Sequence, residues 1–197
     1  MNPSTTYRLF IPAMLLAGMF VSGCVTDLEE VQRVTSYGKL PLQTIRNSRI
    51  VYTDSGKTSF VIEAGRIERY PNQEQPIDEF SEGIKVTSYN FYGDIESELT
   101  AERATNYTDE NIMVAKDSVI LMNKEGKMLN TEELTWNEKE GKIYTDKFVK
   151  ITTLTEILYG DGLEAEEDFS SYEIKNIKGR ITIDQEEDST QVETPIE

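Results

Sequence analysis

The sequence predicts an all-β protein whose antiparallel strands stack in the order in which they occur along the chain. Apolar residues alternate with polar ones in short segments separated by glycine-containing turns, which is the pattern of half-buried strands. A four-residue motif also recurs, as LTAE at residues 99–102, LNTE at 129–132 and LEAE at 163–166. Such self-similarity is typical of stacked-strand architectures. Together these observations predict one elongated β domain over residues 46–184.

The first strands are predicted to form a hairpin. The stretch RIVYTDSGKTSFVIEAGRIERY, residues 49–70, has β-branched and aromatic residues on both sides of a turn at Asp54, Ser55 and Gly56. Alternating apolar residues around such a turn indicate paired strands. After a loop at residues 71–76 the alternation resumes, and it changes phase near Ser88 as a β-bulge would require.

The middle of the chain offers a helical alternative. The stretch SELTAERATNY, residues 97–107, is rich in residues that favour helices. The second copy of the motif continues into TEELTWNEKEGKIYT, residues 131–145, which contains Thr and Trp and breaks at Gly141. Both copies are therefore predicted to be strands. The apolar stretches IMVAKDSVILM and KIYTDKFVKIT, residues 112–122 and 142–152, are predicted to be strands as well.

The C-terminal strands are predicted to form an exposed edge of the sheet. Residues 185–197 are acidic and polar and predict a disordered tail, so no later strand covers this edge. An uncovered edge presents unpaired N–H and C=O groups, to which a partner's strand can add. The residues predicted to form this partner edge are Tyr172, Ile174, Ile177, Gly179 and Ile181.

The inward faces of the strands are predicted to line an internal apolar groove. Alternation sends every second side chain to one face, and the inner faces of two packed sheets meet across about 10 Å. If this space is open along one edge it admits acyl chains, each buried methylene contributing about 0.8 kcal/mol. The predicted groove residues are Phe60, Ile62, Val86, Phe91, Ile112, Val114, Val119, Leu121, Leu134, Trp136, Val149 and Ile151.

The N-terminus carries the pattern of a lipoprotein signal peptide. Arg8 precedes an apolar run at residues 9–21, which is shorter than the ~20 residues that span a bilayer. The run ends in VSGC, and this similarity to the bacterial lipobox implies that Cys24 is acylated and becomes the new N-terminus. Residues 1–23 are then the signal peptide and residues 24–45 an acylated tether. The alternative is a soluble secreted protein with an unmodified Cys24.

Composition excludes several classes of function. The formal net charge of −16 opposes binding to nucleic acid. The chain has no histidine, which excludes Ser-His-Asp and Cys-His catalysis and removes the commonest zinc ligand. Its single cysteine allows no internal disulfide, so a packed core must supply the stability.

The remaining candidate sites favour structural roles over chemistry. Ser55 and Lys57 form no catalytic dyad because nothing nearby supplies an oxyanion hole. The acidic run at residues 166–168 lacks the spacing of a calcium loop and indicates an exposed turn. The GDG at residues 160–162 is expected to form a β-turn. Trp136 is expected to be an aromatic residue of the core. The sequence therefore predicts no catalytic residue, no metal site and no cofactor.

Four segments resemble the LptC family of lipopolysaccharide-export proteins. They are GKMLNTEELTWN at residues 126–137, GKIYTDKFVKI at 141–151, LYGDGLEA at 158–165 and IKNIKGRI at 174–181. The similarity extends over residues 48–183 as a pattern of turns and strands, and LptA-like proteins share it. It implies a β-jellyroll folded like a long V, with no enzymatic activity.

The resemblance also implies partners and a location. A member of this family accepts lipopolysaccharide from an inner-membrane ABC transporter and passes it to the next periplasmic bridge protein, which is LptA-like. Well-known members have a transmembrane helix where this chain has a lipobox, so the expected location is the periplasm, anchored through Cys24, with the inner membrane as the expected membrane. Because the chain is acidic, the acyl chains would carry recognition, with phosphates pointing away or bridged by divalent cations. The alternative function is a structural β-rich lipoprotein that pairs through edge strands and carries no lipid.

Overall fold

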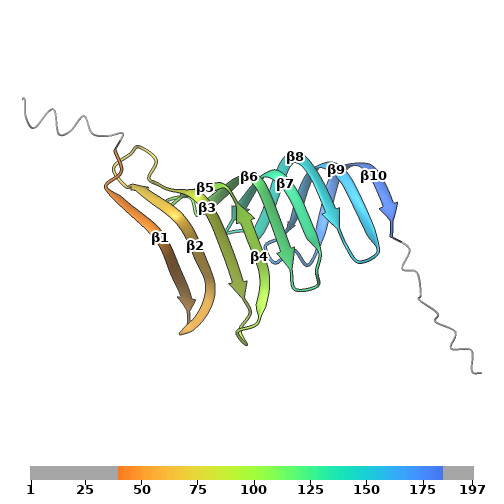
Figure 1. Cartoon of the computed structure of the whole chain (residues 1–197), viewed down its shortest axis with the longest axis horizontal. Helices are drawn as coiled ribbons and strands as arrows, with labels where there is room; N and C mark the ends of the chain where they lie inside the picture. Colours follow the sequence, from red (N-terminus) through yellow and green to blue (C-terminus); the bar gives the residue numbers. More distant parts are fainter. Residues whose placement is uncertain (1–39, 184–197) are drawn as a thin grey trace, which may run out of the picture. The chain divides into compact units, whose positions relative to one another are not determined.

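A computed structural model describes residues 40–183, and these form a single antiparallel sheet of ten strands (Figure 1). The strands lie in the order β1-β2-β3-β4-β6-β7-β8-β9-β10, and the short β5 continues the line of β4 between β3 and β6. The predicted all-β class is therefore confirmed, with strands stacked in sequence order. The strands are β1 (Gln43–Asp54), β2 (Lys57–Tyr70), β3 (Ile77–Tyr89), β4 (Ile95–Ala101), β5 (Arg103–Tyr107), β6 (Ile112–Asn123), β7 (Met128–Asn137), β8 (Lys142–Thr152), β9 (Glu156–Glu166) and β10 (Tyr172–Thr182).

The first hairpin forms where it was predicted. β1 pairs with β2, and Ser55 and Gly56 in the turn have φ angles of 50° and 79°. Two successive positive φ angles give a turn whose twist matches that of the flanking strands. β1 begins at Gln43, before the predicted start of the domain at residue 46. The predicted bulge is also present, at Ser88 and Tyr89 between β3 and β4.

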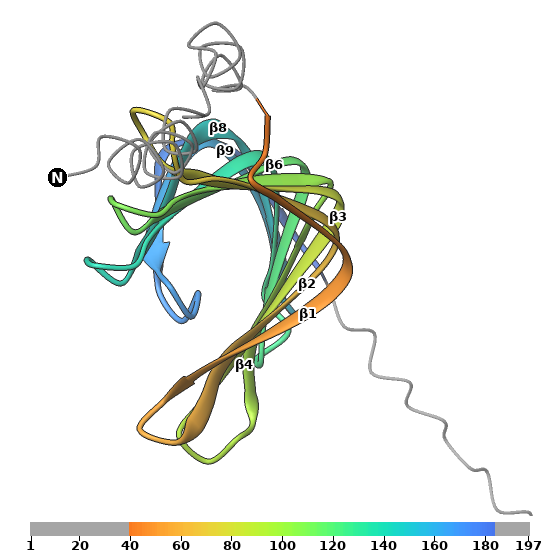
Figure 2. The same ribbon diagram turned by 90° about the vertical axis from the view of Figure 1, so that its left-hand side faces the viewer.

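A single sheet bends over itself, where the sequence had indicated two sheets. The strand register is interrupted near the middle of most strand pairs, and we call this line of interruptions the crease. Figure 2 shows the curled profile that results, because bulges bend strands and increase their twist. The interruptions lie between Ala64 and Arg66, between Lys116 and Val119, between Thr131 and Thr135, and between Thr145 and Phe148.

Backbone geometry at the crease depends on particular residues. A Cβ atom on Gly65 would lie 2.4 Å from the carbonyl oxygen of Glu82, so only glycine allows the two strands to approach so closely. Asp117 and Ser118 both have positive φ angles, of 64° and 53°. Asp117 also pairs with Arg103 of the neighbouring strand, at the crease. An exposed ion pair of this kind contributes little stability by itself, so the bend arises mainly from the backbone.

The crease divides the strands into two walls that face each other across the core. Each wall carries a row of apolar residues opposite one another in adjacent strands, which is how neighbouring strands bury a common face. The row of the first wall is Ile62, Val86, Leu99, Leu121, Leu129, Ile151 and Leu158. The row of the second wall is Ile45, Ile67, Phe80, Ala104, Ala115 and Leu134.

The repeated motif corresponds to the fold in two of its three copies. Leu99 and Leu129 both lie in the first wall, shortly before the crease. Leu163 of the third copy lies beyond Gly162, on the second-wall side of the crease. The residue of β9 that corresponds to Leu129 is Leu158, which is opposite Ile151 as Leu129 is. In the third copy, the residue that matches the motif in sequence, Leu163, is therefore not the residue that takes the equivalent place in the sheet, which is Leu158.

Candidate lipid-binding cavity

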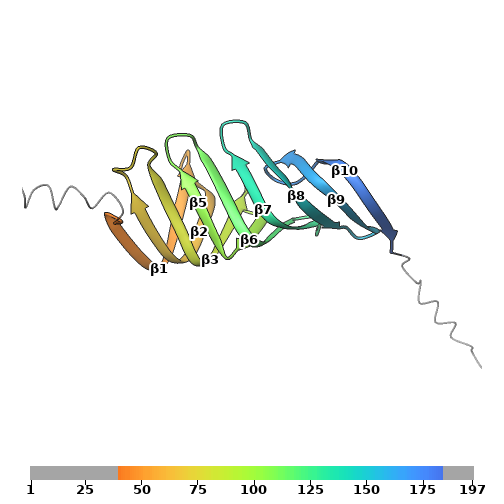
Figure 3. The same cartoon turned by 90° about the horizontal axis from the view of Figure 1, so that it is seen from above.

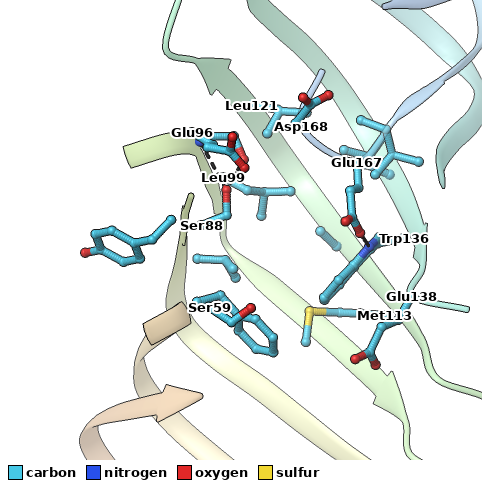
Figure 4. A pocket seen from close by; sticks show the side chains of 17 residues that line it. Ser59, Ser88, Glu96, Leu99, Met113, Leu121, Trp136, Glu138, Glu167 and Asp168 are labelled. Atoms are coloured by element: carbon cyan, nitrogen blue, oxygen red, sulfur yellow. Dashed lines mark hydrogen bonds between the residues drawn. The ribbon is translucent and has the colours of Figure 1, made fainter. Parts of the chain in front are cut away.

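A cavity of about 260 Å³ lies between the two walls (Figure 4). Its apolar lining comes from both walls, because the crease turns the inward faces of the two halves toward each other. Small-molecule sites are typically concave and mainly apolar, with a few polar groups at defined positions. The apolar side chains that line this cavity include Phe60, Val86, Leu99, Met113, Leu121 and Leu134.

Aromatic rings form part of the cavity lining and pack beside it. The rings of Phe60 and Trp136 meet edge to face, with centroids 5.7 Å apart, and Tyr52 stacks on Phe60 at 4.3 Å. The indole Nε1 of Trp136 donates a 3.0 Å hydrogen bond to Oε2 of Glu167 (Figure 4). Trp136 is half-buried, packs against the core as expected, and also lines the cavity. An aromatic side chain with an apolar ring and a polar N–H group suits an amphipathic ligand.

All charged residues that line the cavity are acidic: Glu96, Glu138, Glu167 and Asp168. Partial burial tends to raise the pKa of the Asp168 carboxyl, but hydrogen bonds from Ser170 and the nearby charge of Lys124 lower it below its usual value. This carboxylate is therefore charged at neutral pH. A phosphate beside these residues would meet four carboxylates, of which, within the described residues, only Glu96 is paired with a lysine, Lys124, at 3.7 Å. This surplus of negative charge is unfavourable without a further cation.

Nine of the twelve predicted groove residues face the interior. Each of them is buried, or is partly buried against the core or the cavity. Ile62, Val119, Val149 and Ile151 pack in the core, while the others reach the cavity. Their lipid-binding role stays a prediction. The nine are Phe60, Ile62, Val86, Val119, Leu121, Leu134, Trp136, Val149 and Ile151.

The predicted phase was wrong for Ile112 and Val114. Their neighbours Met113 and Ala115 are buried instead, and both of these line the cavity. The reason is the bulge at Asp117 and Ser118, which shifts the register between the two halves of β6. A one-residue shift exchanges the two faces of a strand. Only the second half of β6 follows the predicted phase.

Phe91 was also assigned to the groove wrongly. It lies in the turn between β3 and β4 and is 69% exposed. The side-chain oxygen of Asn90 accepts hydrogen bonds from the backbone N–H groups of Tyr92 and Asp94, which closes this turn. The ammonium of Lys57 lies 3.5 Å from the centroid of the Phe91 ring, so Lys57 contacts an aromatic face and is not simply solvated.

Several cavity residues were not predicted. Leu99 is the first residue of the repeated motif, and it lies opposite Leu121 in the adjacent strand. The repeat was the sequence signal that could have identified Leu99 as an inward-facing residue. Ser88 and Ser97 both line the cavity, and their hydroxyl groups are 2.8 Å apart. No sequence signal identifies this pair, because small polar residues usually indicate turns.

The predicted partner edge lies on the last strand of the sheet (Figure 3). β10 pairs with β9 on one side, and the described residues place no strand on its other side. Tyr172 and Ile174 pack partly against the core, whereas Ile177 and Ile181 are exposed. Gly179 follows a register shift. Whether this edge binds a partner stays a prediction.

The other candidate sites form no chemical centre in residues 40–183. The hydroxyl of Ser55 donates to Asp54, and Lys57 contacts the Phe91 ring. Within the described range there is no group of three acidic or cysteine side chains that could hold a metal ion. No helix in this range is long and apolar enough to cross a bilayer. Cys24, the predicted signal peptide and the predicted tail from residue 185 lie outside the described residues.

Comparison with known protein families finds a match. A family model described as lipopolysaccharide-assembly, LptC-related, matches residues 13–183. No curated protein matches the chain. Members of this family are periplasmic, membrane-associated transport components and not enzymes. The chain therefore belongs to the LptC family and takes part in lipopolysaccharide transport.

Proposed function

We propose that the space between the walls binds the acyl chains of lipopolysaccharide during export. The supporting observation is a cavity whose lining combines apolar side chains, aromatic rings and carboxylates with no basic residue. Such a surface favours methylene groups, at about 0.8 kcal/mol for each one buried. The phosphorylated head group would remain outside or be neutralised by divalent cations.

In this proposal the protein is a carrier between two partners. It accepts lipopolysaccharide from an inner-membrane ABC transporter and passes it to an LptA-like bridge protein that pairs with β10. The uncovered edge of β10 supports the second contact, because an edge strand can add to another sheet. Acyl chains on Cys24 would hold the protein at the membrane surface. More than one chain is needed for stable anchoring.

A second candidate is a scaffold that joins sheets through its edges and carries no lipid. The observation that favours it is that both β1 and β10 pair on one side only within the described residues. A scaffold needs the edges but not the cavity. Variants that change the cavity and leave the edges intact therefore separate the two functions.

A charge inside the cavity tests the carrier function. Leu99 lines the cavity, and its neighbour Thr100 is exposed on the other face of β4. L99D buries an unpaired carboxylate when lipid is loaded, at a cost of several kcal/mol, so it should abolish co-purification of lipopolysaccharide. T100D is the matched control and should load normally. Equal loading of both variants would contradict the carrier function and favour the scaffold.

A further inference from the structure

The loop between β9 and β10, residues 167–171, places a phenylalanine in the core. Phe169 is 0% exposed and is the largest fully buried side chain in the described part of the chain. Its φ angle is 56°, in the left-handed region that is unfavourable for a bulky residue. The adjacent Ser170 and Ser171 are exposed. A surface loop therefore folds back to insert one aromatic side chain between the walls, and we call residues 167–171 the strap.

On one side the strap is attached to the first wall. The side-chain amide of Asn123, at the end of β6, donates a 3.1 Å hydrogen bond to the carbonyl oxygen of Phe169. The ammonium of Lys127, in the turn that follows, donates to the carbonyl oxygen of Ser170 at 2.8 Å. Both donors come from the rim of the first wall, where β6 turns into β7.

On its other side the strap is attached to the second wall. Trp136 near the end of β7 donates to the Glu167 carboxylate at 3.0 Å. The backbone N–H of Glu167 donates to the carbonyl oxygen of Gly141, which precedes β8, also at 3.0 Å. The strap therefore links the rims of the two walls.

The cavity ends at the strap. Glu167 and Asp168 form part of its lining (Figure 4), and Phe169 stacks on Tyr172 of β10 with ring centroids 5.3 Å apart. Leu158 and Leu163 of β9 belong to the same core as Phe169, and Ile174 of β10 packs against it. None of these three lines the cavity. Phe169 thus occupies the apolar interior between the cavity and the β10 end of the sheet.

From this arrangement we infer that Phe169 sets the length of the lipid groove and that the strap must move before acyl chains reach β10. The inference rests on the proposed carrier function. With the strap in place, acyl chains occupy only the cavity. When the strap leaves, the side chains of Leu158, Leu163 and Ile174 extend the apolar surface to the edge strand. When the strap moves away, Phe169 no longer has to adopt its unfavourable left-handed backbone conformation. The strain of that conformation therefore favours movement of the strap.

Photocrosslinking on each side of the strap tests this inference. The photoreactive residue p-benzoylphenylalanine replaces either Leu99 in the cavity or Ile174 beyond the strap, in the purified full chain loaded with lipopolysaccharide. With the native strap, capture at position 99 should exceed capture at position 174. F169A removes the plug, and K127A removes the bond to Ser170 while leaving the core intact. Each should raise the ratio of capture at 174 to capture at 99 severalfold.

The control is K116A, which removes a lysine that pairs with Glu133 at the crease, far along the strand from the strap. It should leave the ratio unchanged. An unchanged ratio in both strap variants, or equal capture at the two positions with the native strap, would overturn the inference. If circular dichroism shows that F169A does not fold, the capture ratio of K127A alone tests the inference. No capture at position 99 in the folded protein would instead refute the carrier function, and the inference would fall with it.

Discussion

The side-chain amide of Asn123 donates a hydrogen bond to the carbonyl oxygen of Phe169, 46 positions later in the chain. The same side chain accepts hydrogen bonds from the backbone N–H groups of Glu125 and Lys127. Asn123 is 6% exposed. One buried side chain therefore closes the turn between β6 and β7 and holds the loop that ends the cavity.

Removal of this side chain should destabilise the protein measurably. N123A leaves two backbone N–H groups and one carbonyl oxygen without their partner, and each unsatisfied buried group costs about 1–3 kcal/mol. We expect the free energy of unfolding in urea to fall by about 2–4 kcal/mol, because water reaches part of the turn. The control is N130A, on the outer face of β7. A loss no larger than that of the control would show that Asn123 is not structurally important.

The close approach of β9 and β10 depends on Gly160. A Cβ atom there would lie 2.4 Å from Cγ2 of Ile174 and 2.6 Å from the carbonyl oxygen of Asn176. G160A should therefore lower the free energy of unfolding by about 1–3 kcal/mol through overpacking. G179A is the matched control, since a Cβ there meets only Tyr159 at 3.8 Å. If the two variants unfold at the same urea concentration, the packing argument is incorrect.

An arginine on the last strand tests the partner edge. The open surroundings of Gly179 allow a side chain without a clash, so G179R should fold normally. A bulky charge on an edge strand discourages addition of another strand. We expect G179R to pull down less of the LptA-like partner, whereas T44R on β1, at the other edge, should not. Retention of the partner by G179R at the native level would count against pairing through β10.

The predicted lipid anchor can be tested independently of the fold. Cys24 follows the short apolar run and is the single cysteine of the chain. C24A should abolish acylation and leave an unprocessed precursor, visible as a change in the mass of the protein from membranes. S22A, which keeps a small residue beside the site, should be processed normally. An identical mature mass for C24A and the native protein would refute the lipobox.

The sequence predicted most of the strands well because their signal is local, but residues 160–162, expected to form a β-turn, lie within β9. Alternation of apolar residues and turn residues such as Ser55 and Gly56 depend only on neighbouring positions, and both correspond to the structure. The phase failed at Ile112 and Val114 because the bulge at Asp117 and Ser118 has no glycine to mark it. Non-glycine residues with positive φ angles are uncommon and cannot be anticipated from composition.

The end of the cavity could not be predicted for a different reason. Phe169 lies in the polar stretch EEDFSS, where a single aromatic residue shows no periodicity. Its burial depends on Asn123 and Lys127, which are far away in sequence. The acidic run does form a turn, with Glu167 exposed as expected, but the bond from Trp136 to Glu167, 31 positions apart, was not predicted. Long-range contacts of this kind leave no pattern in a single sequence.

The central claim is that lipopolysaccharide occupies the inner face of the sheet, and two adjacent residues of β6 test it most directly. Leu121 is 3% exposed and lines the cavity, whereas Met122 is 38% exposed on the opposite face. p-Benzoylphenylalanine at each position, irradiated in living cells, should capture lipopolysaccharide at position 121 and little or none at position 122. Equal capture at both positions, or capture at 122 alone, would contradict the claim.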